Sequence, residues 1–216
     1  MPLIYSDQPE ENQTIGIWKI EEPPDFFLEK LIFSDWETSY FRRIKHPNRQ
    51  ASWLSSRYLI KILLETDVFV ELLFDTNGKP ILNHQGWRLS ISHTHEYAAV
   101  YLAKDREVGL DIESSTRSVA PISHKFLSQE EWKMLDNDQL DTHLLLHWGA
   151  KETMYKIYGR KLLDFREHMF VEPFKPQKSG VIHGYINKHQ KINCTMNYKV
   201  QDGYSLVTGF PDDSKA

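Results

Sequence analysis

The sequence predicts an α+β protein with two similar lobes, each made of a long helix packed on a small, mainly antiparallel sheet. The chain has 216 residues, of which 40% are hydrophobic and 26% charged, a globular composition that can bury a real core. In each half, a long segment of helical periodicity (48–65, then 141–158) precedes several short strand-like segments. We therefore expect an N-terminal lobe over residues 1–105 and a C-terminal lobe over 106–216.

The N-terminal lobe is expected to begin with a strand over residues 14–20. An aromatic-rich segment that follows the Pro-Pro pair at 23–24 is predicted to be helical. Pro47 and Asn48 mark the start of the long helix, because proline breaks the preceding structure and asparagine caps a helix well. Three further strands are predicted, over residues 68–74, 88–92 and 97–102, with an Asn77-Gly78 turn after the first.

The C-terminal lobe is expected to begin with a strand over residues 108–113. Ser128 and Glu131 have the spacing of a capping box, so a short helix is predicted to start there. Gly159 lies where a glycine commonly ends a helix, in this case the second long helix. The C-terminal part is predicted to contain four strands, over about 165–171, 180–187, 192–200 and 204–209.

Composition excludes several classes of protein. The net charge of −4 argues against a general nucleic-acid binder, because phosphate-backbone binding needs clustered Lys and Arg side chains. Cys194 is the only cysteine, which excludes a disulfide framework and a cysteine-based zinc site. The sequence shows neither a signal peptide nor an apolar run of the ~20 residues that a membrane helix needs. We expect a cytoplasmic protein with no nucleic-acid or membrane partner.

The helix predicted around residues 147–159, HWGAKETMYKIYG, carries candidate functional residues on one face. Trp148, Glu152 and Lys156 are spaced by four residues and therefore lie one above another. Together with Lys151, Lys156 could bind phosphate oxygens and stabilise the charge on a leaving group. The alternative is a solvated helix face with ordinary i,i+4 charge pairs.

Asp111 and Glu113 alternate along the strand predicted over 108–113, so both carboxylates project to the same side. Two acids so close repel each other unless a cation lies between them. Mg²⁺ suits that position, because it binds carboxylates and completes its coordination with water and substrate phosphate oxygens. Glu152 is the candidate third ligand. The alternative is a pair of solvated acids at an exposed strand end.

Ser92 and His93 are predicted at the end of another strand, where side chains commonly reach a site. A structural histidine is the alternative, and a two-histidine metal site with His95 lacks an obvious third ligand. Basic residues in the first half could together meet an anionic ligand, although each alone is typical of a surface: Arg42, Arg43, Lys45, Arg49 and Lys79. The sequence contains no P-loop, Rossmann or nucleophile-elbow motif.

These motifs together resemble the 4′-phosphopantetheinyl transferase superfamily. The family pattern is G-[VIL]-D-[IVL]-E followed by W-x-x-K-E-[AS]-x-x-K, and the chain has GLDIE at 109–113 and WGAKETMYK at 148–156. The Ser-His pair at 92–93 and the Gly-Lys-Pro turn at 78–80 also match in type and order. The chain departs from the family at two positions: Ser90 replaces a frequent Asn, and Thr153 replaces Ala or Ser. Ile112, which the pattern allows between the two acids, cannot bind metal, so a water would complete the coordination.

The resemblance implies Mg²⁺-dependent transfer of the 4′-phosphopantetheine arm of coenzyme A, the co-substrate, to a serine of an apo acyl or peptidyl carrier protein. The product released is 3′,5′-ADP. Chain length and the two similar lobes resemble the larger, pseudo-dimeric type that activates peptide synthetases, such as the surfactin type. That type implies a monomer with its active site at the lobe interface.

The resemblance also implies a role for each site residue. Asp111, Glu113 and Glu152 would hold Mg²⁺, and Glu152 or a metal-bound water would take the proton of the serine. Lys156 would contact phosphate and assist the departing 3′,5′-ADP, and Lys151 would support Lys156. Ser92 and His93 would bind the 3′-phosphate end of coenzyme A. Arg49 and Lys79 would bind its other phosphates.

Two alternatives to this function are a non-catalytic homologue that binds coenzyme A or a carrier protein, and a different Mg²⁺-dependent phosphotransfer enzyme on the same fold. The set of Asp111, Glu113, Glu152 and the two lysines argues against a loss of catalysis. Carrier recognition is expected in the segment 114–140, where Phe126, Leu127 and Trp132 are candidates. Their alternative role is in the core.

Overall fold

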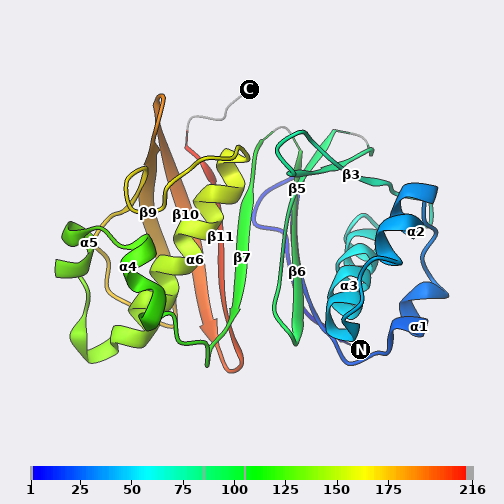
Figure 1. Cartoon of the computed structure of the whole chain (residues 1–216), viewed down its shortest axis with the longest axis horizontal. Helices are drawn as coiled ribbons and strands as arrows, with labels where there is room; N and C mark the ends of the chain where they lie inside the picture. The colour runs from blue at the N-terminus through cyan, green and yellow to red at the C-terminus, as the bar shows by residue number, and fades with distance from the viewer. Residues whose placement is uncertain (1, 85, 105, 213–216) are drawn as a thin grey trace. The chain divides into compact units, whose positions relative to one another are not determined.

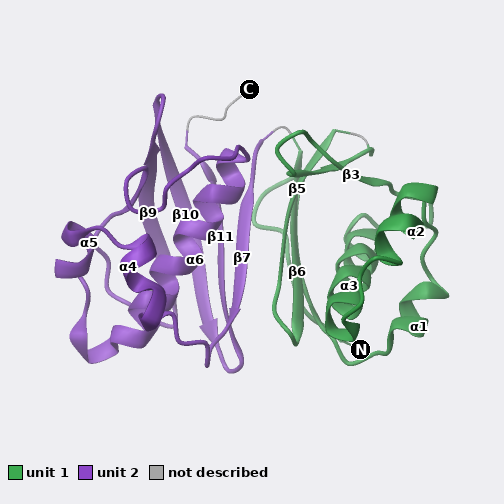
Figure 2. Cartoon of the chain, in the orientation of Figure 1, with its two compact units in different colours: residues 1–105 green, residues 106–216 purple. Residues whose placement is uncertain are grey.

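The computed structural model describes residues 2–84, 86–104 and 106–212. The chain divides into two compact units, residues 1–105 (unit 1) and 106–216 (unit 2), which are coloured separately in Figure 2. Each unit combines a sheet with a long helix (Figure 1). The expectation of a mixed α+β protein with two sheet-and-helix regions is therefore confirmed.

Unit 1 contains a four-stranded antiparallel sheet of order β1-β2-β6-β5 and a separate hairpin, β3-β4. Its elements in chain order are β1 (Leu3–Asp7), β2 (Gln13–Lys19), α1 (Pro24–Leu28), α2 (Asp35–Phe41), α3 (Pro47–Leu63), β3 (Leu72–Phe74), β4 (Pro80–Leu82), β5 (Trp87–His93) and β6 (Tyr97–Lys104). The long helix α3 packs on β2 and β6. Gly16 of β2 permits this approach, because a Cβ atom there would lie 2.9 Å from a methyl carbon of Leu63.

Two features of unit 1 differ from the sequence-based expectation. The strand predicted over 68–74 forms only from Leu72, because the backbone N–H of Val68 is bonded to the side-chain oxygen of Thr66 in a turn. β1 was not predicted. It is an edge strand that is stabilised by pairing with β2, and its mostly exposed residues give little hydrophobic pattern.

Unit 2 contains a five-stranded antiparallel sheet of order β7-β11-β10-β9-β8. Its strands and longer helices are β7 (Gly109–Ser114), α4 (Ser123–Phe126), α5 (Gln129–Lys133), α6 (Leu140–Tyr158), β8 (Met169–Val171), β9 (Ser179–Asn187), β10 (Lys191–Gln201) and β11 (Tyr204–Pro211). Two single 3₁₀ turns, η1 (Ala120–Ile122) and η2 (Asn137–Gln139), lie in the connections.

The helix α6 covers β7 and β11, as Figure 1 shows. Gly109 allows β7 to come close to the helix, because a Cβ atom there would collide with the carbonyl oxygen of Thr153. The predicted helix signals are confirmed: Ser128 and Glu131 form a reciprocal capping box, and Gly159 ends α6 with φ of 63°. Within the described residues, no helix is both long and apolar enough to span a membrane.

Two histidines of α6 are buried against Phe174. The ring centroids of His143 and His147 lie 4.6 and 5.3 Å from that of Phe174. His147 is 2% exposed and donates a hydrogen bond from Nδ1 to the carbonyl oxygen of His143. Burial lowers the pKa of His147 to about 3, and also lowers the pKa of His143.

This burial predicts acid sensitivity. Between its unfolded pKa of about 6.5 and its folded pKa of about 3, His147 binds a proton more readily in the unfolded chain, so stability falls as pH falls. From pH 7 to pH 5 we expect a loss of about 2 kcal/mol from this group. Urea unfolding at both pH values will measure it. His147→Gln, which stays neutral, should show a smaller loss, and an equal loss would contradict the assignment.

Candidate active site

Both acids of the GLDIE segment lie on β7 and are buried. Asp111 is 5% exposed and Glu113 is 8% exposed. β7 is paired with β11 on one side, and α6 packs on it. The alternative of two solvated acids at an exposed strand end does not fit these values. Two buried carboxylates two residues apart require neighbouring donors or cations.

Lys156 of α6 supplies one such cation. Its Nζ atom lies 2.9 Å from Oδ1 of Asp111 and donates a second hydrogen bond of 2.7 Å to the carbonyl oxygen of Leu110. The lysine therefore joins the last turns of α6 to the middle of β7. Its side chain is 23% exposed, so the ammonium group keeps access to solvent and to a ligand.

Glu113 is held by Trp148 and Arg117. The indole N–H of Trp148 donates a hydrogen bond of 2.8 Å to Oε1 of Glu113, and the Arg117 guanidinium forms an ion pair with the same oxygen. The guanidinium carbon also lies 5.3 Å from the Trp148 ring centroid. Burial and the charge of Asp111 raise the pKa of Glu113, while Arg117 and Trp148 oppose the rise. No motif in the sequence predicts a role in the site for Arg117, which lies in the loop after β7.

Glu152 faces the same group of charges from α6. Burial raises the pKa of Glu152 to about 7, and the charges of Asp111 and Glu113 add to the rise, whereas Lys156 opposes it. The charges of Asp111 and Glu113 on β7 therefore destabilise the charged form of Glu152 on α6. Among the residues that the structure describes, no three His, Cys, Asp or Glu side chains are arranged so that they could hold a metal ion.

Lys151 lies elsewhere, although it precedes Glu152 directly. Its side chain is fully buried, and four acceptor oxygens, which its three N–H groups share, lie 2.6–2.9 Å from Nζ: the carbonyls of Phe126, Phe165 and Met169 and the Oε2 atom of Glu131. An ammonium group with four protein acceptors and no exposure cannot reach a phosphate. The predicted phosphate-binding role of Lys151 therefore does not fit this geometry.

Glu131 is the partner that the sequence did not reveal. Besides accepting from Lys151 at 2.7 Å, it accepts from the backbone N–H of Ser128 at 2.8 Å and of Val171 at 3.0 Å. The sequence identified Glu131 only as half of a capping box. The ion pair with Lys151 spans 20 residues, and no local spacing rule indicates it.

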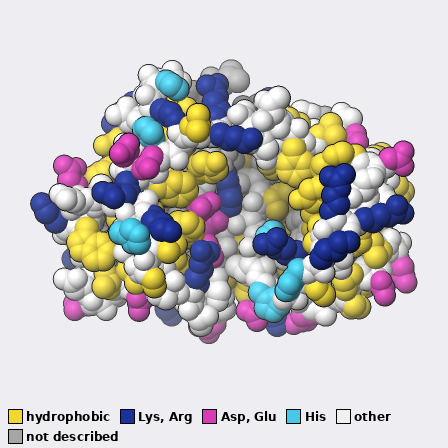
Figure 3. Space-filling view, in the orientation of Figure 1, with side chains coloured by type: hydrophobic (Ala, Val, Ile, Leu, Met, Phe, Trp, Pro, Cys, Tyr) yellow, Lys and Arg dark blue, Asp and Glu magenta, His cyan; other side chains and the backbone are white. Residues whose placement is uncertain are grey.

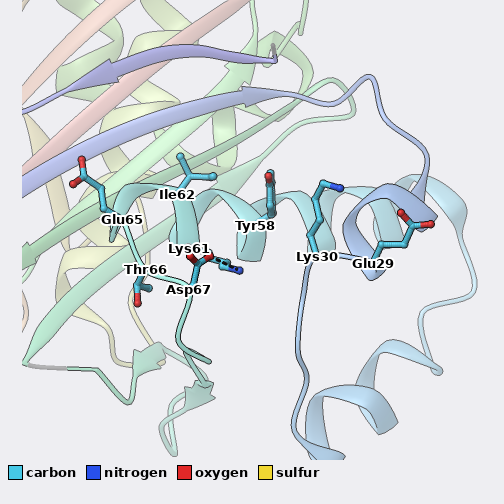
Figure 4. Close-up of a pocket in the computed structure, with 8 residues that line it drawn as sticks. All are labelled: Glu29, Lys30, Tyr58, Lys61, Ile62, Glu65, Thr66 and Asp67. Atoms are coloured by element: carbon cyan, nitrogen blue, oxygen red, sulfur yellow. Dashed lines mark ion pairs between the residues drawn. The ribbon is translucent and has the colours of Figure 1, made fainter.

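The other predicted site residues belong to unit 1. Arg49 is exposed in the first turn of α3, and Lys79 lies in the β3-β4 turn, where its backbone N–H donates a 2.8 Å bond to Asp75. Ser92 and His93 end β5, opposite Ala99 and Ala98 of β6. A cavity of about 530 Å³ beside the Lys61–Asp67 ion pair of unit 1 is lined by none of these four residues (Figure 4).

The three candidates for carrier recognition differ in how far their side chains are exposed to solvent. Phe126 and Leu127 are 1% and 4% exposed and belong to a core cluster with Leu144 and Leu145 of α6. Their alternative role, in the core, is the one that the structure supports. Trp132 of α5 is 50% exposed and is the only one of the three on the surface.

Residues 107–208 match the family model of the 4′-phosphopantetheinyl transferase superfamily. The matched segment lies within unit 2. The matched segment contains the β7 acids and the Glu152 and Lys156 pair of α6. A search of curated proteins found no match.

Members of the 4′-phosphopantetheinyl transferase superfamily are enzymes that transfer phosphopantetheine to carrier proteins, typically with Mg²⁺ and coenzyme A. Within the matched segment, Lys156 contacts Asp111 and Trp148 contacts Glu113. The charges of Asp111 and Glu113 also act on Glu152. These residues are supplied by one strand and one helix, whose contact depends on Gly109.

Proposed function

We propose that the protein transfers the 4′-phosphopantetheine arm of coenzyme A to a serine of an apo acyl or peptidyl carrier protein and releases 3′,5′-ADP. The observation that carries this proposal is the electrostatic coupling of Glu152 to Asp111 and Glu113, beside Lys156, in the segment that matches the transferase family model. Such a group of carboxylates is costly for a fold without a ligand, because buried like charges destabilise each other.

The residues fit Mg²⁺ by the chemistry of their donors. Asp111, Glu113 and Glu152 offer only carboxylate oxygens, the ligands that Mg²⁺ prefers, and the raised pKa of Glu152 indicates excess negative charge at this place. Asp111, Glu113 and Glu152 would hold the ion. When bound, it would neutralise charge on the pyrophosphate of coenzyme A.

The chain's own side chains would perform the remaining chemistry. The serine hydroxyl of the carrier protein attacks the β-phosphate, a new O–P bond forms, and the bond to 3′,5′-ADP breaks. Glu152, or a water on the metal, would accept the serine proton. The pKa of Glu152 is raised to about 7 without a bound cation, and Mg²⁺ held by the same carboxylate would lower it. Lys156 turns from Asp111 toward the departing phosphate and stabilises its charge.

The contribution of unit 1 is part of the same proposal. Arg49, Lys79, Ser92 and His93 would bind the phosphates of coenzyme A. Two sheet-and-helix units in one chain support the pseudo-dimeric subtype, for which a monomer is expected. Lys151 is left out of the phosphate site because of its burial.

Mass spectrometry tests this function directly. The full chain is incubated with Mg²⁺, coenzyme A and a panel of apo carrier proteins. We expect one carrier to gain a single phosphopantetheine, with an equal amount of 3′,5′-ADP released and no gain in the presence of a chelator. No gain with any carrier, together with calorimetric binding of coenzyme A, would favour the non-catalytic alternative. A nucleotide product other than 3′,5′-ADP would indicate a different phosphotransfer enzyme.

A further inference from the structure

Three aromatic side chains form a continuous exposed surface on unit 1, which we call the aromatic face: Trp36, Tyr40 and Phe74. They are 43%, 40% and 42% exposed. The ring centroid of Trp36 lies 5.4 Å from that of Tyr40 and 5.7 Å from that of Phe74, so the surface continues from α2 to β3. Solvent-exposed aromatic side chains in contact with one another are unusual unless they bind something.

Other side chains also hold α2 on unit 1. Glu37, about 100° around the helix from Trp36, is 1% exposed and forms a 3.2 Å ion pair with Arg57. Phe41 packs with its ring centroid 5.4 Å from that of Trp53. Tyr40 also contacts Trp53, with ring centroids 6.0 Å apart. Trp36 and Tyr40 nevertheless remain 43% and 40% exposed.

The chain next to the aromatic face is strongly basic. No Asp or Glu occurs between residues 38 and 64, although the whole chain has a net charge of −4. Arg42, Arg43 and Lys45 directly follow α2 and are exposed. Figure 3 shows Lys and Arg side chains in dark blue beside yellow hydrophobic ones over the region where α2 lies. Charge complementarity requires an acidic partner.

The ring arrangement favours a protein partner over a nucleic acid. Tyr40 stacks on both Trp36 and Trp53, with interplanar angles of 24° and 23°, so its faces are already in contact with other rings. A nucleic-acid base needs a free ring face for stacking. The exposed parts suit the aliphatic side chains of a protein, and Trp, Tyr and Arg are the residues that anchor protein interfaces.

We propose that the aromatic face and the basic residues 42–45 dock the acidic surface of a carrier protein. The occupant rests on the proposed function, since the carrier protein is the one macromolecular substrate of this transferase family. Trp132 is the competing anchor. Glu130 lies close to it in sequence, but Lys133 follows it directly and it lines a cavity with His124 and Arg166, so its surroundings carry charges of both signs. Unit 1 is favoured because Arg42, Arg43 and Lys45 directly follow α2 and no Asp or Glu occurs between residues 38 and 64.

Binding measurements with matched variants test the docking surface. The full chain is titrated by calorimetry with an apo carrier protein whose exposed helices are rich in Asp and Glu. Trp36→Ser and Arg43→Glu are expected to raise the Kd by about tenfold or more. Trp132→Ser and Lys133→Glu, the corresponding changes in unit 2, are expected to leave the Kd within about twofold. Binding should also weaken with added salt.

Other outcomes are distinguishable. An unchanged Kd in Trp36→Ser and Arg43→Glu, or loss of binding only in the Trp132 and Lys133 variants, would overturn the docking proposal while leaving transfer intact. Carrier binding that depends on Trp36 without any transfer would support docking and contradict the proposed function. Retention of single-stranded RNA by the wild type, lost in Trp36→Ser, would replace the protein partner with a nucleic acid. Unchanged thermal unfolding and coenzyme A affinity in Arg43→Glu exclude misfolding as the cause.

Discussion

Replacing Glu152 with Gln is expected to reduce transfer of phosphopantetheine by about 10²–10⁴-fold, the range associated with loss of a general base. The substitution keeps the size of the side chain but removes both its basicity and its charge. Without a bound cation, burial and the charges of Asp111 and Glu113 raise the pKa of Glu152 to about 7, and Glu152 is the carboxylate that we propose accepts the serine proton. The rate of transfer at saturating coenzyme A is the measurement.

A second readout separates loss of chemistry from loss of structure. In metal-free buffer, Glu152→Gln should unfold at the same temperature as the wild type or higher, because it relieves repulsion with Asp111 and Glu113. Added Mg²⁺ should raise the unfolding temperature of the wild type more than that of the variant, since a bound ligand stabilises the folded state.

The matched control is Glu172→Gln, which changes an exposed glutamate of unit 2. It should retain full transfer and the full Mg²⁺ effect. If Glu152→Gln kept more than about a tenth of wild-type transfer, a residue other than Glu152 would have to accept the serine proton.

Much of the fold follows from local patterns in the sequence. The apolar spacing of residues 48–65 and 141–158 predicted α3 and α6 to within a few residues, because a helix that packs on a sheet must keep one apolar side. The capping box at Ser128 and the glycine at 159 also behave as their local chemistry predicts. Predictions were poorest where tertiary pairing decides the structure, as in β1, which depends on β2.

The same distinction applies to the candidate site. Alternation along β7 predicted that Asp111 and Glu113 share one face, and the four-residue spacing on α6 predicted that Lys156 lies on the side of Glu152 and Trp148. The structure places Lys156 beside Asp111 and Trp148 beside Glu113, and the role of these residues in a site stays a prediction. The role of Lys151 was not accessible from spacing. It depends on Glu131 and on three backbone carbonyls contributed by separate segments of unit 2. Helical periodicity predicts on which side of a helix a residue lies, but not which other residues pack against that side.

Lys151→Met is expected to destabilise unit 2 by about 3–5 kcal/mol, the cost of breaking a buried ion pair and leaving one charge behind. Lys151 and Glu131 are both fully buried, so the carboxylate of Glu131 would lose its cation, and the carbonyls of Phe126, Phe165 and Met169 would lose their donor. Burial lowers the pKa of Lys151, and Glu131 opposes this shift, so the charged lysine depends on its partner.

Urea unfolding of Lys151→Met, Lys156→Met and the double variant Lys151→Met/Glu131→Gln distinguishes a structural lysine from a phosphate-binding one. Lys156 is partly exposed, so Lys156→Met should lose transfer with a smaller change in stability. The double variant should recover part of the stability that Lys151→Met loses, because it removes the uncompensated charge. If Lys151→Met unfolded like the wild type yet failed to bind coenzyme A, Lys151 would be a phosphate ligand after all, and the ion pair with Glu131 would have to open in the working enzyme.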